Sequence, residues 1–187
     1  QKFFLTSGLG SMGFGLPQSI GIAIENPGQS IVLVESDGSL AMNIQELQTI
    51  SNLKLPVCII LMNNSGYASI RNTQSNYFEN RFFGTGKEAG QDMPDWEKIA
   101  SAYGFEYASI EQKIEIKNSL DIFYKNQVPT MIDVKLVENE LLQPKCAAIP
   151  QADGSILSMP LEDMTPLIPL NELREIMGGN ISEQSKE

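Results

Sequence analysis

Short apolar runs alternate with amphipathic segments along residues 2–137 of the chain. Residues 31–35 and 57–62 are almost wholly apolar, which is typical of strands buried on both faces of a sheet. Residues 44–53 instead carry apolar side chains three positions apart, and this spacing predicts a helix with one buried face. The whole pattern predicts strands at 2–6, 31–35, 57–62, 105–108 and 130–137, and helices at 11–25, 44–53, 95–103 and 114–125.

This alternation of strands and helices predicts an α/β fold of three layers, α/β/α, with a mainly parallel sheet. Sheets of this kind bind ligands at the C-terminal ends of their strands. After Val137 the chain becomes rich in Pro, Gly and isolated hydrophobic residues, with a turn signal at Asp153-Gly154. We therefore expect residues 1–137 to form one domain, and residues 138–187 to form an irregular C-terminal arm or lid with a short helix near 171–177.

The composition narrows the possible functions. Of the 187 residues, 42% are hydrophobic and 19% are charged, which suits a globular core. The net charge of −10 disfavours binding to nucleic acid or anionic membranes, and no apolar run reaches the ~18 residues of a membrane span. The chain has two cysteines, Cys58 and Cys146, which are too few for a disulfide framework. It has no histidine, which excludes a Ser–His or Cys–His catalytic pair and a His-ligated metal in this chain. We expect a reducing, cytoplasmic location, and chemistry carried by carboxylates, amides or a cofactor.

The first motif, residues 8–13 (GLGSMG), lies between a predicted strand and a predicted helix. It has the G-x-G-x-x-G form of dinucleotide-binding folds, and Glu35 ends the next strand, where such a fold places its ribose-binding acid. An NAD-dependent dehydrogenase is therefore one alternative. Pro17, early in the predicted helix, argues against it, and this alternative leaves two later motifs unexplained.

These two motifs each follow a buried strand: Asp37-Gly38-Ser39 follows the first, and Asn64 to Gly66 follows the second. One helix and one strand separate them, so both motifs emerge at the same edge of a parallel sheet, where neighbouring strands lie ~4.8 Å apart. A carboxylate, an amide oxygen and a free carbonyl are suitable ligands for an Mg²⁺ ion that also binds phosphate oxygens. The glycines let backbone N–H groups approach a phosphate. The Ser39 hydroxyl lies near the start of the following helix, whose positive end favours anions. Each motif alone is compatible with an ordinary turn, but the pair predicts a metal-bridged diphosphate.

The three motifs resemble those of thiamine-diphosphate (ThDP) enzymes, above all the catalytic subunit of acetolactate synthase. These enzymes share Gly-Asp-Gly followed, after a similar interval, by Asn-Asn; here Ser36 replaces the first glycine and Asp37 is retained. The resemblance implies that Asp37, Asn64 and the main-chain oxygen of Gly66 hold Mg²⁺ on the cofactor diphosphate. The residues that it implies for cofactor binding are Gly10, Ser11, Met12, Asp37, Gly38, Ser39, Asn64, Gly66, Tyr67 and Ala68.

Residues 9–17 resemble the acetolactate synthase segment that grips the aminopyrimidine ring of the cofactor. By that resemblance, the Gly10 carbonyl accepts a hydrogen bond from the 4′-amine, and the Met12 N–H donates to a ring nitrogen. The Met12 side chain wedges the cofactor into its bent shape.

The resemblance also implies the reaction. In this family the cofactor decarboxylates a 2-keto acid and the acyl unit passes to an acceptor. The proton transfers need a glutamate from a pyrimidine-binding domain, which belongs to the same or a partner polypeptide. We therefore expect no catalytic residue in this chain, no activity of the chain alone, and assembly into a homodimer or tetramer.

Two residues bear on the substrate. Ile70 stands where relatives of pyruvate decarboxylase often carry an acid, and an apolar residue there favours carbon–carbon bond formation. Thr73 replaces a tryptophan typical of acetolactate synthases and leaves room for a different or larger acceptor. We expect a carboligase that uses pyruvate; a 2-keto acid decarboxylase subunit, an NAD-dependent dehydrogenase and a non-catalytic assembly module remain alternatives. Arg71 and Arg81 are candidates for contacts with a substrate carboxylate or with acids at an interface.

Overall fold

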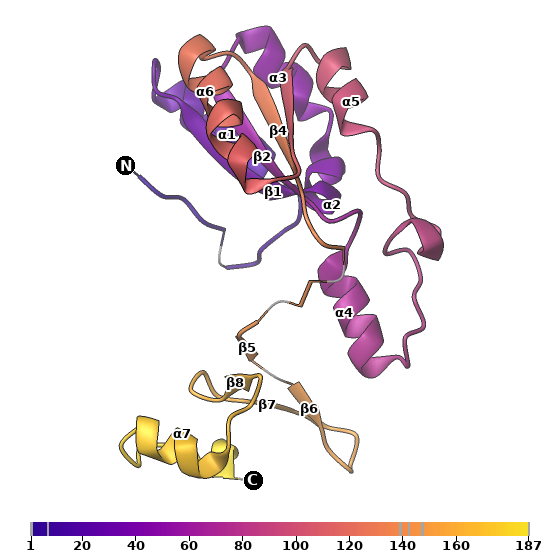
Figure 1. Ribbon diagram of the computed structural model, residues 1–187, viewed down its shortest axis with the longest axis vertical. Helices are drawn as coiled ribbons and strands as arrows, with labels where there is room; N and C mark the ends of the chain where they lie inside the picture. The colour runs from indigo at the N-terminus through magenta and orange to yellow at the C-terminus, as the bar shows by residue number, and fades with distance from the viewer. Residues whose placement is uncertain (1, 7, 139, 142, 147, 187) are drawn as a thin grey trace. The chain divides into compact units, whose positions relative to one another are not determined.

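The computed structural model describes residues 2–6, 8–138, 140–141, 143–146 and 148–186. The chain divides into two compact units, residues 1–140 and 141–187. The first unit is built on a parallel sheet of four strands in the order β1-β2-β4-β3 (Figure 1). The strands are β1 (Ile31–Ser36), β2 (Val57–Asn63), β3 (Glu106–Ile110) and β4 (Thr130–Lys135). The predicted α/β fold with a mainly parallel sheet is therefore confirmed.

The helices of this unit connect and cover the strands. They are α1 (Gly15–Glu25), α2 (Asp37–Leu40), α3 (Glu46–Leu53), α4 (Ala68–Tyr77), α5 (Trp96–Ala102) and α6 (Ile116–Asn126), with 3-10 turns η1 (Ala41–Asn43), η2 (Lys87–Ala89) and η3 (Lys113–Glu115). The four predicted helices are all present, each shorter than expected. The pattern did not indicate α4, because α4 has no buried residue and therefore no apolar stripe.

Alternate strand residues face two hydrophobic clusters on opposite sides of the sheet. On one side, Val57, Ile59 and Leu61 of β2 pack in a cluster with buried residues of α1, α3 and α5. On the other side, Cys58 packs with Phe123 of α6 and with residues of β3 and β4. Helices therefore cover both faces of the sheet, which gives the three layers.

Residues 2–6 were predicted to form a strand, and this prediction is wrong. No described residue of this segment pairs with the sheet, and Phe3 and Leu5 are exposed. The neighbouring sheet edge is β1, whose side chains Val32 and Val34 are 43% and 61% exposed. An apolar run becomes a strand only where another strand offers it backbone partners, and this segment has none among the described residues.

The second unit contains two small antiparallel sheets and one helix. The sheets pair β5 (Lys145–Cys146) with β8 (Met164–Thr165), and β6 (Ala148–Pro150) with β7 (Ile156–Ser158). The expected Asp153-Gly154 turn joins β6 to β7, with Gly154 at a φ of 84°. The expected short helix is α7 (Leu170–Ile176), followed by the 3-10 turn η4 (Gln184–Lys186).

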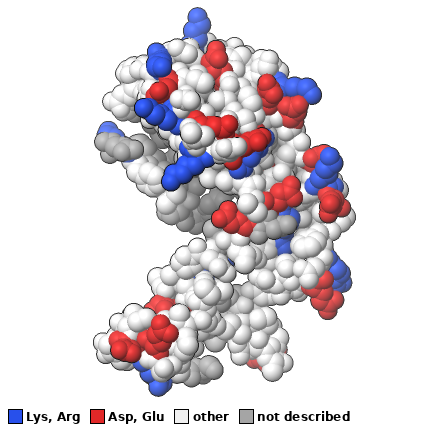
Figure 2. All heavy atoms as spheres, viewed as in Figure 1, with Lys and Arg blue, Asp and Glu red and all other residues white. Residues whose placement is uncertain are grey.

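Charged side chains of both signs are interspersed over the face of the α/β unit drawn in Figure 2. Among the described residues, no helix has the length and apolar character needed to cross a bilayer.

Candidate functional site

The loops that carry the second and third motifs lie side by side at one edge of the sheet. Strands β1 and β2 are parallel neighbours, and Ser36, the last residue of β1, is in register with Met62. Asp37 follows Ser36 at the start of α2, and Asn64 follows the end of β2. The sheet therefore brings Asp37 and Asn64 to the same rim, as the spacing of the motifs predicted.

The Asp37 carboxylate is fully buried and joins the two loops. Its Oδ1 accepts a hydrogen bond of 2.8 Å from the Gly38 N–H, and its Oδ2 accepts one of 2.8 Å from the Gly66 N–H. Burial raises the pKa of Asp37, whereas the Gly38 and Gly66 amides and the charge of Arg71 lower it. Burial is the largest of these effects, so the neighbouring groups stabilise the buried negative charge only in part. A cation beside this carboxylate would stabilise it further.

The amide oxygen of Asn64 has no hydrogen-bond partner among the described residues, although it is buried. The preceding Asn63 is different: its Oδ1 accepts from the Ser65 N–H at 3.1 Å, and its Nδ2 donates to Asp133 at 2.9 Å. A buried acceptor without a donor costs about 1–3 kcal/mol, and a bound ion is one way to satisfy it. The orphaned oxygen of Asn64, in the loop whose Gly66 N–H bonds to Asp37, therefore has the character of a cation ligand.

The glycines of both loops are required by close packing. A Cβ on Gly38 would lie 2.5 Å from the Tyr67 ring. Gly66 has a φ of 137°, which L residues rarely adopt, and a Cβ there would collide with the Thr85 carbonyl. Tyr67 therefore lies directly over the first loop, and the two loops form one packed unit.

The first motif is tied to the same unit through Gly13. Its N–H donates to the Ser39 hydroxyl at 2.7 Å, and its carbonyl accepts from Asn43 Nδ2 at 2.8 Å. Gly13 has a φ of 80°, and a Cβ on it would lie 2.8 Å from Met42. Ser39 therefore holds the first motif in place through its oxygen, a contact that the sequence did not indicate.

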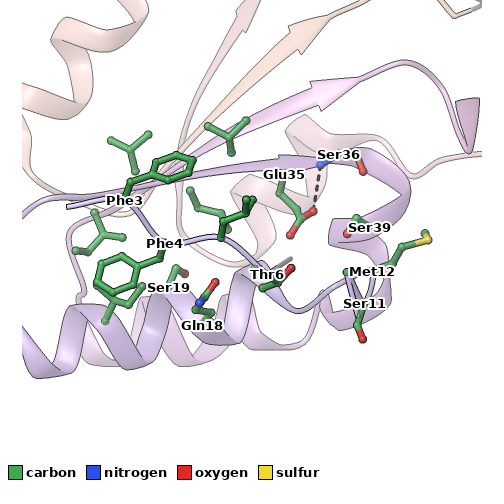
Figure 3. A pocket seen from close by; sticks show the side chains of 18 of the residues that line it. Phe3, Phe4, Thr6, Ser11, Met12, Gln18, Ser19, Glu35, Ser36 and Ser39 are labelled. Atoms are coloured by element: carbon green, nitrogen blue, oxygen red, sulfur yellow. Dashed lines mark hydrogen bonds between the residues drawn. The ribbon is translucent and has the colours of Figure 1, made fainter. Parts of the chain in front are cut away.

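A cavity of about 930 Å³ opens between the first motif, β1 and the loop after β2. In Figure 3, Glu35 and Ser36 lie at the end of β1, across from Thr6, whereas Ser39 lies beside Ser11 and Met12 of the first motif. Of the residues expected to contact the cofactor, those that line the cavity are Gly10, Ser11, Met12, Ser39, Asn64, Gly66, Tyr67 and Ala68. Asp37 and Gly38, which are both buried, complete the expected set beneath this lining.

The two expected substrate-pocket residues have different positions. Ile70 lines the cavity and is 43% exposed. Thr73 is not among the lining residues; it is exposed, and its hydroxyl donates to the Ser69 carbonyl at 3.1 Å within α4. Glu35, the acid of the dehydrogenase alternative, lies against the start of α1, where a Cβ on Gly15 would collide with its carboxylate.

A buried polar network supports the loop after β2 from below. Asp133 of β4 is fully buried and accepts from Asn63, from the Tyr107 hydroxyl at 2.9 Å and from Lys135 Nζ at 2.5 Å. Burial and the bond to Asp133 raise the pKa of Tyr107. Through Asn63 this network fixes the Ser65 N–H and thus the course of the loop. The sequence offered no sign of it, because Asn63, Tyr107 and Asp133 are far apart in the chain.

The two candidate arginines also differ. Arg71 directs its guanidinium at main-chain carbonyls, including those of Asn64 and Thr85, which differs from the expected role in binding a substrate or interface carboxylate. Arg81 is exposed and lies 3.9 Å from Glu79.

The donor set fits a hard divalent cation. One carboxylate, one amide oxygen without a donor and a main-chain carbonyl would provide three oxygen ligands and would leave other positions for phosphate and water. Among the residues that the structure describes, no group of three or more His, Cys, Asp or Glu side chains forms a metal cluster. The metal-ligand set expected from the sequence contains only one side chain of these four types, that of Asp37.

Comparison with known proteins shows which family the chain resembles. Residues 1–134 match the family described as thiamine pyrophosphate enzyme, C-terminal TPP binding domain. The acetolactate synthase isozyme 2 large subunit of Escherichia coli K12 is 34% identical over 144 residues, covering 77% of this chain and 26% of that protein. The acetolactate synthase large subunit of Porphyra purpurea is 32% identical over 142 residues, covering 76% of this chain and 24% of that protein. The chain thus spans about a quarter of the length of these relatives.

A similar solved structure is the thiamine diphosphate-dependent 4-hydroxybenzoylformate decarboxylase of Rhodococcus jostii RHA1. It has a TM-score of 0.59 and 25% identity, covering 70% of this chain and 24% of that chain.

Proposed function

From the premise that this chain belongs to the thiamine pyrophosphate enzymes and contains their C-terminal TPP-binding domain, we propose that it binds the thiamine diphosphate of an acetolactate-synthase-like carboligase through Mg²⁺. The cation is held by Asp37, Asn64 and the Gly66 carbonyl. The observation that carries this proposal is the orphaned amide oxygen of Asn64 at the rim where Gly66 binds Asp37. Both side chains have buried oxygens that a cation would satisfy.

The remaining site residues position the organic part of the cofactor. Gly38 and Ser39, which belong to α2, would contribute the Gly38 backbone and the Ser39 hydroxyl to the binding of the diphosphate. The Gly10 carbonyl and the Met12 N–H serve the aminopyrimidine ring, and the Met12 side chain supports its bent shape. Ser11, Tyr67 and Ala68 line the same cavity.

The bound cofactor supplies the carbanion chemistry that decarboxylates a 2-keto acid, with pyruvate as the proposed substrate, and transfers the acyl unit. The contribution of this chain is to bind, to orient and to exclude water. Ile70 presents an apolar side chain to the cavity, which favours transfer to a carbon acceptor over protonation. The catalytic glutamate comes from a pyrimidine-binding domain of the same or a partner polypeptide, within a cytoplasmic homodimer or tetramer. The 187 residues alone are therefore inactive.

A 2-keto acid decarboxylase is the second candidate, because the similar solved structure is named as a decarboxylase. Product analysis separates the two candidates. The complete enzyme is given pyruvate, with and without aldehydes or 2-keto acids as acceptors. Ligated products support the carboligase, whereas free aldehyde as the main product supports the decarboxylase.

Cofactor binding is tested by thermal shift of the 187-residue chain with ThDP, with and without Mg²⁺. Thiamine monophosphate is the matched control, because it lacks the bridging diphosphate. We expect a rise in melting temperature only when ThDP and Mg²⁺ are both present. Stabilisation by NAD instead would support a dehydrogenase, and no stabilisation by any of these ligands, in the chain or in the complete enzyme, would support a non-catalytic assembly module.

A further inference from the structure

Arg71 lies on the first turn of α4 and reaches four main-chain carbonyls from three separate parts of the chain. Its Nη1 donates to the Thr85 carbonyl at 2.6 Å and, at 3.5 Å, to that of Ser65. Its Nη2 donates to the Asn64 carbonyl at 2.9 Å and to the Glu138 carbonyl at 2.5 Å. Such planar, forked donation to several acceptors at fixed positions is specific to a guanidinium.

We propose that Arg71 is a positioning residue for the cation site. Its guanidinium holds the loop from Asn64 to Gly66 in the conformation that binds the metal–diphosphate. This inference rests on the proposed function and deepens it, because no role in that site was expected for Arg71. Arg71 is not among the residues that line the cavity, so in this role it acts through the backbone of the loop.

The loop lies between two fixed groups. On one side, the Gly66 N–H donates to Asp37. On the other side, a Cβ on Gly66 would lie 3.0 Å from Arg71 Nη1, so the guanidinium packs directly against this residue. The bond from Arg71 to the Asn64 carbonyl fixes the backbone from which the orphaned amide oxygen projects. Loss of the guanidinium would therefore free both metal-binding residues of the loop.

Arg71 also couples the loop to the segment from Phe83 to Gly86. The Thr85 carbonyl accepts from both Arg71 and the Tyr67 N–H, and Thr85 is 1% exposed. One turn further along α4, Gln74 exchanges two hydrogen bonds of 3.1 Å with the backbone of Phe83. Two side chains of α4 thus fasten this segment behind the cation loop.

The charge of Arg71 and its geometry have opposite consequences for cation binding. A positive charge near Asp37 repels a divalent cation, so if only the charge mattered, its removal would tighten metal binding. If Arg71 orders the loop, its removal would weaken metal binding, since the ligands would have to be ordered at the moment of binding. The sign of the change therefore distinguishes the two roles.

The test measures binding of Mn²⁺ to the 187-residue chain in the presence of ThDP, from the paramagnetic resonance signal of free Mn²⁺. The variants are Arg71→Lys, which keeps the charge, and Arg71→Gln, which removes it. Arg81→Gln is the matched control, because Arg81 is exposed and bonded only at the surface. We expect both Arg71 variants to bind Mn²⁺ about 10–100-fold more weakly, the range typical of residues that orient metal ligands, and the control to match the wild type.

Amide hydrogen exchange of the ligand-free chain gives a second measurement. We expect faster exchange at Gly66 and Tyr67 in Arg71→Lys, with unchanged exchange in the central strands. If Arg71→Gln does not fold, the comparison of Arg71→Lys with the wild type still tests the inference.

Unchanged or tighter Mn²⁺ binding in the Arg71 variants, with normal binding by the wild type, would overturn the inference and leave the proposed function standing. Absence of Mn²⁺-dependent ThDP binding by the wild type, in the 187-residue chain and in the complete enzyme, would overturn both.

Discussion

The main-chain N–H of Gly66 donates a hydrogen bond of 2.8 Å to Oδ2 of Asp37, and this bond joins the loop after β2 to the loop after β1. The two residues are distant in the chain and meet because β1 and β2 are parallel neighbours in register. The bond uses one acceptor site on the carboxylate oxygen, and a carboxylate oxygen has further acceptor capacity. The contact therefore fixes the side chain that the proposed metal site needs without blocking it.

Asn64→Ala should separate stability from binding. The substitution removes a buried amide oxygen that has no partner among the described residues. It therefore relieves a desolvation cost of about 1–3 kcal/mol, and the free energy of unfolding should not fall in urea denaturation. The Mg²⁺-dependent affinity for ThDP should fall more than about tenfold, because a metal ligand is lost. Asn52→Ala, on the exposed side of α3, is the control and should retain wild-type affinity. Wild-type affinity in Asn64→Ala would contradict the proposed ligand set.

Gly38→Ala should destabilise the fold through a single contact. The added methyl group would lie 2.5 Å from the Tyr67 ring, and overpacking of this kind costs about 1–3 kcal/mol. In the Tyr67→Ala background the ring is absent, so the same substitution should cost much less.

Urea denaturation of the four proteins of this cycle measures the coupling. Gly21→Ala is the control: a Cβ at Gly21 in α1 meets nothing within 4 Å, and the substitution should stabilise by about 0.5–1 kcal/mol. Equal costs of Gly38→Ala in both backgrounds would show that the ring is not the obstacle.

Asp133→Ala should destabilise the fold strongly. It removes the buried carboxylate that accepts from Asn63, Tyr107 and Lys135. The buried Asn63 amide and the half-buried Tyr107 hydroxyl then lose their acceptor, and each polar group left without a partner costs about 1–3 kcal/mol. Tyr107→Phe, which removes one donor, should cost about 1 kcal/mol. The free energies of unfolding from urea denaturation check both values. If Asp133→Ala cost less than Tyr107→Phe, the network would not be important for stability.

Cys58 should resist alkylation in the folded chain. Burial raises its thiol pKa from 9.0 to about 12, so at pH 8 the reactive thiolate is almost absent. Iodoacetamide should modify the partly exposed Cys146 in the native chain, and Cys58 only after unfolding in urea. Peptide mass mapping checks this, and equal labelling of both cysteines in the native chain would contradict it.

The same shift fixes the sign of a pH effect. The folded state holds the Cys58 proton more tightly than the unfolded state, so this stabilisation is fully present below pH 9.0 and is lost as the pH rises toward about 12. Cys58→Ala should flatten this part of the stability profile in urea titrations at increasing pH. An unchanged profile would contradict the burial of the thiol.

The sequence by itself determined the four strands of the sheet and the rim at which Asp37 and Asn64 meet. Continuous apolar runs predict buried parallel strands, and parallel strands all end at one edge, so order along the chain becomes position in space. The same logic failed for residues 2–6, which are apolar but lack a strand partner, and for α4, which has no buried face.

Only the tertiary structure decided which groups support the site. The bond from Asn63 to Asp133 and the bond from Arg71 to Glu138 each join residues far apart in the chain. Neither carries a local pattern, because a hydrogen bond depends on the distance and direction between two groups in the folded state. Hydrophobic periodicity is a property of one segment and can be recognised in the sequence, whereas such polar contacts exist only after the segments have packed together.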